Sequence, residues 1–76
     1  MVLAEVFADI FEQPVASFTD ASNQESVDGW TSLRHVALLV GVENAYGIRF
    51  SNAEMASMRS MGDIRSALQR KGVDVS

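Results

Sequence analysis

The spacing of apolar residues at the start of the chain constrains its fold more than any other feature. These residues fall at positions i, i+3, i+4, i+7 and i+8: Leu3, Val6, Phe7, Ile10 and Phe11. This spacing places them on one face of an α-helix, with the acidic residues off that face. We expect an amphipathic helix over residues 2–12, ended by Pro14 because a proline drives the preceding residue out of the helical conformation.

A long polar segment follows over residues 13–31, in which Ser, Thr, Asp, Asn, Gln and Gly predominate. A loop of this length is unusual in a compact domain, and such loops are commonly functional or packed by their own side chains. Val15, Phe18 and Val27 interrupt its polar character. We expect these three residues to hold the loop against the core.

A second helix is predicted over residues 32–46. Its apolar face has the following members: Leu33, Val36, Leu39, Val40 and Val42. Gly47 stands where a left-handed residue commonly ends a helix. Gly41 lies inside the helix, where glycine costs about 1 kcal/mol relative to alanine. Close approach of a neighbouring helix would explain this glycine.

Two shorter helices complete the pattern. Residues 51–54 read Ser-Asn-Ala-Glu, a capping box that starts a helix over residues 52–58. Residues 60–63 read Ser-Met-Gly-Asp and open a last helix over residues 61–71, which Gly72 ends. The inward residues of this last helix are expected to be Ile64, Ala67 and Leu68. The prediction is an all-α fold with three main helices, one short third helix and a long first loop.

Length and composition exclude several classes of function. The chain has 76 residues, which allows one small domain over residues 1–76. Its net charge of −4 argues against nucleic acid, because Lys and Arg build that affinity. No apolar run approaches the roughly 18–20 residues that span a bilayer, and the N-terminus lacks the basic start of a signal peptide. We expect a cytoplasmic monomer with no membrane or nucleic-acid partner.

Catalytic and metal sites find little support in the sequence. His35 is the only histidine and the chain has no cysteine, so a Cys–His pair is impossible. Ser32 lies three residues before His35 on one helix, with no evident carboxylate to orient the imidazole. A partly exposed structural residue is the more ordinary role for His35. The acidic residues fall in no calcium or zinc spacing, and no glycine-rich phosphate loop is present. We expect neither enzymatic activity nor a metal site.

Ser32 is the candidate functional residue. It lies where the polar loop turns into the second helix, close to backbone N–H groups that have no partner within the helix. Those donors and the helix dipole favour a negative group, so a phosphate ester on the Ser32 hydroxyl would meet a favourable field. Serine is also a common N-cap, and on spacing alone a capping role is the ordinary alternative.

The residues around Ser32 carry a resemblance to a known family. Residues 30–35 read Trp-Thr-Ser-Leu-Arg-His, and residues 43–50 read Glu-Asn-Ala-Tyr-Gly-Ile-Arg-Phe. Residues 61–64, Met-Gly-Asp-Ile, follow where a last helix opens. This pattern resembles the acyl and peptidyl carrier proteins, with Asp-Ser-Leu or a variant followed by a helix ending in Glu-x-x-Phe-Gly-Ile. The similarity runs over about residues 3–71.

The resemblance implies a four-helix acyl-carrier-like bundle with 4′-phosphopantetheine attached to Ser32. A phosphopantetheinyl transferase would supply this arm from coenzyme A. The terminal thiol would hold an acyl or aminoacyl group as a thioester, loaded by a ligase and used by downstream biosynthetic enzymes. The carrier itself would do no chemistry, and would raise the effective concentration of a tethered substrate at each partner.

Departures from the family pattern indicate a specialised, stand-alone carrier in a dedicated pathway. Thr31 stands where fatty-acid carriers usually have Asp, which leaves the matching transferase open. The second helix, the usual docking surface in the family, has Glu43 as its only acid, with Asn44 and Ala45 where acids are frequent. Residues expected to shape partner recognition surround Ser32: Trp30, Thr31, Leu33, Arg34, His35 and Val36.

Several alternatives remain open at this point. Trp30 either packs against the first turn of the second helix or contacts the arm or a partner. Three methionines are either pliable core residues or a lining for an acyl chain: Met55, Met58 and Met61. We expect Arg34→Glu to alter the salt dependence of partner binding more than folding. The competing function is an unmodified helical interaction module in which Ser32 only caps a helix.

Overall fold

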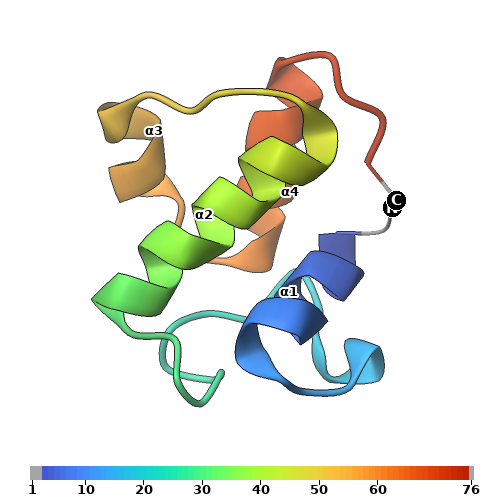
Figure 1. The fold of residues 1–76 in the computed structure, drawn as a ribbon, viewed down its shortest axis with the longest axis vertical. Coiled ribbons are helices and arrows are strands. Elements are labelled where there is room, and N and C mark those ends of the chain that lie inside the picture. Colours follow the sequence, from blue (N-terminus) through green and yellow to red (C-terminus); the bar gives the residue numbers. More distant parts are fainter. Residues whose placement is uncertain (1–2, 76) are drawn as a thin grey trace.

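The computed structural model describes residues 3–75, and over this range the chain is helical and contains no β-strand. The elements are α1 (Leu3–Phe11), a 3₁₀ turn (Val15–Ser17), α2 (Ser32–Tyr46), α3 (Asn52–Ser57) and α4 (Met61–Arg70). The fold is therefore all-α, with four α-helices and a long loop before α2 (Figure 1). The N-terminal limit expected for the first helix, residue 2, lies outside the described residues, as do residues 1 and 76.

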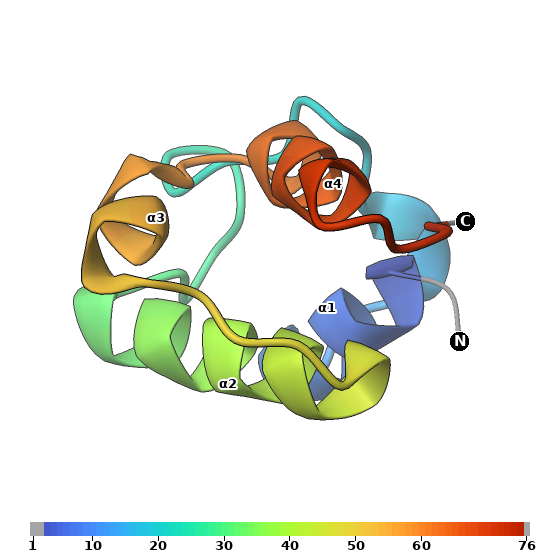
Figure 2. The same cartoon turned by 90° about the horizontal axis from the view of Figure 1, so that it is seen from above.

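The four helices surround one apolar core. Figure 2 shows α2 along one side, α1 and α3 at its two ends, and α4 opposite. The largest fully buried side chains come from α1, α2 and α4 and from the residue that follows α3: Leu3, Phe7, Leu38, Leu39, Val42, Ile64, Leu68 and Met58. The expected inward face of α4 is confirmed, because Ile64 and Leu68 are fully buried and Ala67 nearly so. A core shared by every long helix fixes the orientation of α2, which carries the candidate site.

Local capping sets where the helices begin and end. The capping box is confirmed: the Ser51 hydroxyl accepts from the Glu54 N–H at 3.1 Å, and the Glu54 carboxylate accepts from the Ser51 N–H at 2.8 Å. Ser60 caps α4 in the expected way by accepting from the Asp63 N–H. Gly47 ends α2 in the left-handed conformation, with φ 67°. These caps satisfy backbone groups that a helix end leaves without intrahelical partners.

The end of α1 differs from the expectation. The helix stops at Phe11, and Glu12 adopts the left-handed conformation with φ 55°. Pro14 then precedes the 3₁₀ turn instead of ending the helix itself. The helix therefore ends before the steric effect of Pro14 is reached.

The long loop is held against the core by two of the three side chains expected to do so. Phe18 and Val27 are buried as expected, and the Phe18 ring packs on Phe7 at 5.4 Å between centroids. Val15 does not hold the loop to the core, because its side chain is 45% exposed on the 3₁₀ turn. Two of the three residues expected to hold the loop against the core therefore do so.

Backbone hydrogen bonds fasten the same loop to the start of α4. The Met61 N–H donates to the Ser22 carbonyl at 3.0 Å, and the Gly62 N–H donates to the Asp20 carbonyl at 2.9 Å. The Asp20 carboxylate also pairs with the Arg65 guanidinium at 2.9 Å. The loop thus satisfies donors at the start of α4 and has a defined path to the start of α2.

The apolar face expected for α2 is divided between core and surface. Leu39 and Val42 are buried together with Leu38, whereas three other apolar residues are exposed: Leu33, Val36 and Val40. At about 100° per residue, those three lie within about 60° of one another on the side of α2 away from the core. The five residues expected on one apolar face therefore lie on two sides of α2, and only Leu39 and Val42 of them are buried. We call Leu33, Val36 and Val40 the α2 stripe.

Candidate functional site

Ser32 is the first residue of α2, and its side chain is exposed. The N-cap is the preceding residue, Thr31, whose hydroxyl accepts from the Arg34 N–H at 3.2 Å. The Ser32 hydroxyl makes no hydrogen bond to any residue within 3–75. The hydroxyl of Ser32 is therefore not used as a cap, and it faces solvent at the end of the helix.

Unpaired backbone donors lie beside this hydroxyl. The N–H groups of Ser32 and Leu33 have no acceptor in the described part of the chain, while the next two N–H groups, of Arg34 and His35, donate to Thr31. The 15 residues of α2 also direct the positive end of their aligned peptide dipoles to this point. Two free donors and a positive helix end suit an anionic group bonded to the Ser32 oxygen.

Trp30, two residues before Ser32, is buried in the core. Its side chain is only 4% exposed, and its ring packs on Phe7 and Phe11 with centroid distances of 5.5 and 5.6 Å. A side chain this buried offers almost no surface to a partner, so Trp30 is not placed for direct contact with one. Trp30 therefore acts as a packing residue. Most of its ring contacts come from α1, and α2 contributes His35.

Both ring nitrogens of His35 are occupied. Nδ1 accepts from the Trp30 indole N–H at 3.0 Å, and Nε2 lies 3.0 Å from the Met55 carbonyl. These partners assign the ring proton to Nε2, since only that tautomer lets Nδ1 accept while Nε2 donates. His35 therefore joins the long loop, α2 and α3, and in this arrangement neither nitrogen is free to activate Ser32.

Arg34 has a structural contact that its sequence position does not reveal. Its guanidinium Nη1 donates to the Ile10 carbonyl at 2.6 Å, one of the last four carbonyls of α1. Such carbonyls lack intrahelical partners, and a cation is favourable beside them. Arg34→Glu would therefore also remove this link between α1 and α2, so the substitution should affect folding as well as the salt dependence of partner binding.

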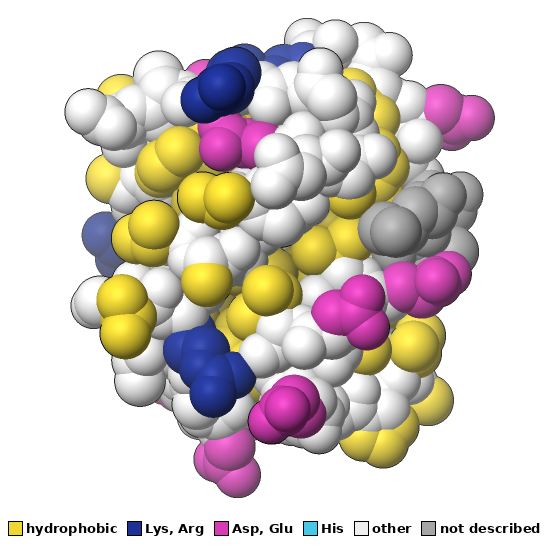
Figure 3. All heavy atoms as spheres, viewed as in Figure 1, with side chains coloured by type: hydrophobic (Ala, Val, Ile, Leu, Met, Phe, Trp, Pro, Cys, Tyr) yellow, Lys and Arg dark blue, Asp and Glu magenta, His cyan; other side chains and the backbone are white. Residues whose placement is uncertain are grey.

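The α2 stripe gives the neighbourhood of Ser32 an apolar surface. Leu33, directly after Ser32, is 82% exposed, and Val36 and Val40 continue the stripe along the helix. Figure 3 shows hydrophobic side chains gathered along α2 on this face of the molecule. The surface beside Ser32 is thus apolar over two turns of the helix, with Arg34 near the same end.

Glu43, the only acid of α2, faces inward. It is buried, and its carboxylate accepts from the Phe50 N–H at 2.7 Å. The carbonyl of the same residue accepts from the Gly47 and Ile48 N–H groups. Glu43 therefore holds the link between α2 and α3 in place and adds little charge to the exposed face. The sequence motif contains this residue, but no local pattern indicates the bond to Phe50.

The methionines take structural positions. Met58 and Met61 are each 2% exposed, and both belong to the core. Met55 is partly buried against that core and supplies the carbonyl that His35 contacts. These positions favour the pliable-core interpretation of the methionines.

The remaining surface features provide no metal site or membrane span within residues 3–75. No group of three acidic or histidine side chains converges there in a way that could hold a metal ion, and each described helix is too short or too polar to cross a bilayer. No protein-family model matches the chain, and no curated protein matches it significantly. The case for a function therefore depends on the residues and geometry of the chain itself.

Proposed function

We propose that this chain is a carrier protein whose Ser32 hydroxyl accepts a 4′-phosphopantetheine arm. The observation that carries the proposal is the exposed Ser32 hydroxyl, which has no hydrogen-bond partner in the described residues and lies beside two free N–H donors. Thr31 already caps α2, so the alternative role of Ser32 as the cap loses its support. The sequence resemblance around residues 30–50 points to the same attachment.

The chain's contribution to attachment would be a nucleophile and an anion site. The Ser32 oxygen would attack the phosphorus of coenzyme A that bears the pantetheine, and adenosine 3′,5′-bisphosphate would leave as the P–O bond breaks. The hydroxyl proton would pass to a base of the transferase, because His35 has no free nitrogen. The N–H groups of Ser32 and Leu33 would then donate to the phosphodiester oxygens. The bound arm supplies the thiol that carries an acyl or aminoacyl group as a thioester.

The α2 stripe would serve as the docking surface for the transferase and for the enzymes that load and process the cargo. Apolar side chains exposed beside a reactive group are typical of sites that bind protein partners. Glu43 faces inward, so this surface lacks the acidic character of many carrier helices. A partner that fits it would offer apolar side chains rather than a cluster of basic ones, which favours a specialised pathway.

An unmodified interaction module is the second candidate. The α2 stripe is the observation that favours it, because an exposed apolar row can bind a partner without any attached group. The two candidates differ in one prediction: the carrier requires a covalent modification of Ser32, and the interaction module does not.

Mass spectrometry separates these candidates. Incubation with coenzyme A and a promiscuous phosphopantetheinyl transferase should add the mass of one arm, and Ser32→Ala should abolish the addition. Ser66→Ala is the matched control, since Ser66 is also an exposed helical serine, on α4. An unchanged mass with several transferases would instead support the unmodified interaction module.

A further inference from the structure

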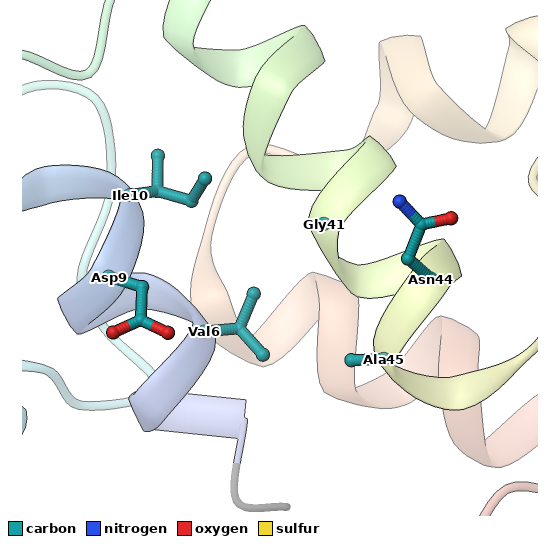
Figure 4. A pocket seen from close by; sticks show the side chains of 6 residues that line it. All are labelled: Val6, Asp9, Ile10, Gly41, Asn44 and Ala45. Carbon is teal, nitrogen blue, oxygen red and sulfur yellow. The ribbon is translucent and has the colours of Figure 1, made fainter.

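A predominantly apolar groove runs between α1 and α2 (Figure 4). Val6 and Ile10 of α1 point across it toward Gly41 and Ala45 of α2. The groove has a volume of about 340 Å³, and each of its walls is one helical turn long, a rise of about 6 Å. It can take in one or two side chains of another molecule, but not a whole helix, which is about 10 Å wide.

Gly41 makes this groove deeper than the packing of the two helices requires. A Cβ added at Gly41 would lie 3.5 Å from Val6 Cγ1 and 3.8 Å from Ile10 Cδ1, which are ordinary van der Waals contacts. Alanine would therefore fit, and it would avoid the destabilising effect of glycine inside a helix. Helix packing thus does not explain the glycine, whereas its missing side chain leaves room for a side chain from outside.

Two carboxylates lie on α1 beside the groove. Asp9 lines it, and Glu5, one helical turn earlier, is the neighbour of Asp9 on the surface of the helix. Both side chains are exposed, and neither forms an ion pair with another residue of the described range 3–75. Figure 3 shows acidic side chains over α1 on the face that it presents. The apolar groove therefore has an acidic border on its α1 side.

The position of Asp9 is unfavourable for α1 itself. Like charges four residues apart on a helix repel, so Asp9 and Glu5 destabilise each other. Asp9 also stands in the last turn of α1, where the helix dipole disfavours a negative charge. Arg34 donates to the Ile10 carbonyl at this end of the helix but forms no ion pair with Asp9. Cations from another molecule would relieve both unfavourable interactions.

The distribution of charge along the chain would guide such cations to α1. The first 30 residues contain no basic residue and six acidic ones: Glu5, Asp9, Glu12, Asp20, Glu25 and Asp28. In α2 the only acid is Glu43, which is buried. Because complementary charges orient two proteins as they meet, a basic surface would approach α1 rather than the exposed face of α2.

We propose that the α1–α2 groove is a docking site for a partner protein that inserts an aliphatic side chain flanked by Lys or Arg. The aliphatic side chain would contact Val6 and Ala45, and its removal from water would favour the complex. The flanking cations would pair with Glu5 and Asp9 and fix the orientation of the partner.

This docking site is separate from the α2 stripe and from the proposed attachment site. Gly41 lies about 100° around α2 from Val40, so the groove and the stripe face different directions. The groove needs no group attached to Ser32, and the proposal therefore goes beyond the carrier function and does not depend on it.

The test is an NMR titration of the intact, unmodified chain with three synthetic alanine-based helical peptides. The first has one leucine with lysines one helical turn to either side, the second has glutamates in place of the lysines, and the third has alanine in place of the leucine. The leucine–lysine peptide should shift the amide resonances of Val6, Asp9, Gly41 and Ala45, and added salt should weaken its binding. The other two peptides should produce no such shifts at the same concentration.

Substitutions separate the groove from the net charge of the chain. Glu5→Gln combined with Asp9→Asn should weaken binding of the leucine–lysine peptide about two- to thirtyfold, the range that two exposed ion pairs supply. Glu25→Gln combined with Asp28→Asn is the matched control, because it removes two exposed acids that lie outside the groove. Gly41→Leu should abolish binding by filling the groove. Gly41→Ala, for which there is room, should weaken it even if the leucine variant does not fold.

Three results would overturn the docking site. Shifts centred on Leu33 and Val36 would place the peptide on the α2 stripe. Equal binding of all three peptides would show that neither the leucine nor the lysines are recognised. Equal weakening by the two double substitutions would show that binding follows the net charge and not the groove. Ser32→Ala should bind the peptide as the unsubstituted chain does, so failure of arm attachment would overturn the carrier function and leave the docking site standing.

Discussion

Thr31 and Ser32 are neighbouring hydroxyl residues that play different parts at the start of α2. The Thr31 hydroxyl caps the helix, whereas that of Ser32 has no partner within residues 3–75. We expect Thr31→Ala to lower the free energy of unfolding by about 1 kcal/mol, the usual value of an N-cap. Ser32→Ala should change it by less than about 0.5 kcal/mol. Urea denaturation of both variants measures the difference, and equal losses would show that Ser32 shares the capping.

Substitution of His35 should weaken the contacts among the long loop, α2 and α3, because this residue joins all three. His35→Phe retains an aromatic ring beside Trp30 but removes both hydrogen bonds, leaving the Trp30 indole N–H and the Met55 carbonyl without their partner. The expected loss is about 1–3 kcal/mol of unfolding free energy, together with a changed Trp30 fluorescence spectrum. Val36→Ala, an exposed neighbour on the same helix, serves as the control. Unchanged stability and fluorescence would show that His35 does not join these segments.

At the residue scale, the sequence predicted the position of Ser32 at a helix start but not every contact of the residues around it. The pattern placed Ser32 at a helix start, and the structure places it there. It could not decide which hydroxyl caps α2, because Thr and Ser are both good N-caps. The contact of Arg34 with the Ile10 carbonyl joins residues 24 positions apart, and no local pattern encodes such a bond. The burial of Trp30 likewise follows from how α1 and the loop meet.

Among the helical elements, two glycines should respond to alanine in opposite directions. Gly41→Ala should raise the free energy of unfolding by up to about 1 kcal/mol, because the new methyl group meets Val6 at an ordinary distance. Gly62→Ala should lower it, because the Cβ would lie 3.0 Å from the Asp20 carbonyl oxygen, which also accepts from the Gly62 N–H. Paired urea denaturation curves test the signs. Stabilisation by both substitutions would contradict the packing of the loop on α4.

The junction of α3 with the end of α4 should weaken in acid. The Ser51 backbone N–H lowers the pKa of Glu54 below its ordinary value, and the hydrogen bond from Lys71 lowers it further. The unfolded chain therefore takes up this proton first as the pH falls. The stability that Glu54 contributes is fully present above its unfolded pKa and is lost as the pH falls through its folded pKa.

An NMR titration of the Glu54 carboxyl group measures this effect directly. The pKa should lie below that of a glutamate in an unfolded peptide, and Lys71→Ala should raise it only in part because the Ser51 N–H remains. Glu54→Gln should remove the corresponding acid-dependent part of the unfolding free energy. A pKa at or above the peptide value would contradict the capping arrangement.

The residues at which the helices begin and end could be predicted from the sequence better than the sides of the helices that face the core. Limits depend on local caps, so Ser51, Ser60 and Gly47 could be recognised from their neighbours. The face of α2 could not, because apolar residues lie on two sides of this helix and periodicity alone does not say which side meets the core. The buried side, with Leu38 and Val42, is set by contact with the other helices.

On the scale of the whole molecule, the α2 stripe is an apolar surface that folding does not require. The core is complete without the α2 stripe, since the buried cluster draws on every long helix and on the loop. Leu33 is the most exposed member of the stripe and directly follows Ser32. An exposed leucine contributes little to folding, whereas burial of the same side chain against a partner stabilises the complex.

Leu33→Ser should therefore separate partner binding from stability. The free energy of unfolding should change by less than about 0.5 kcal/mol. In contrast, kcat/KM for arm transfer from coenzyme A should fall by about fivefold or more, since loss of a buried apolar contact at an interface costs at least about 1 kcal/mol. Val15→Ser is the control, because Val15 is also an exposed aliphatic residue but lies on the 3₁₀ turn. An unchanged kcat/KM for Leu33→Ser would exclude the stripe as the transferase docking surface even if Ser32 is modified. A loss at Val15 equal to that at Leu33 would place docking on a broader face, which includes the long loop.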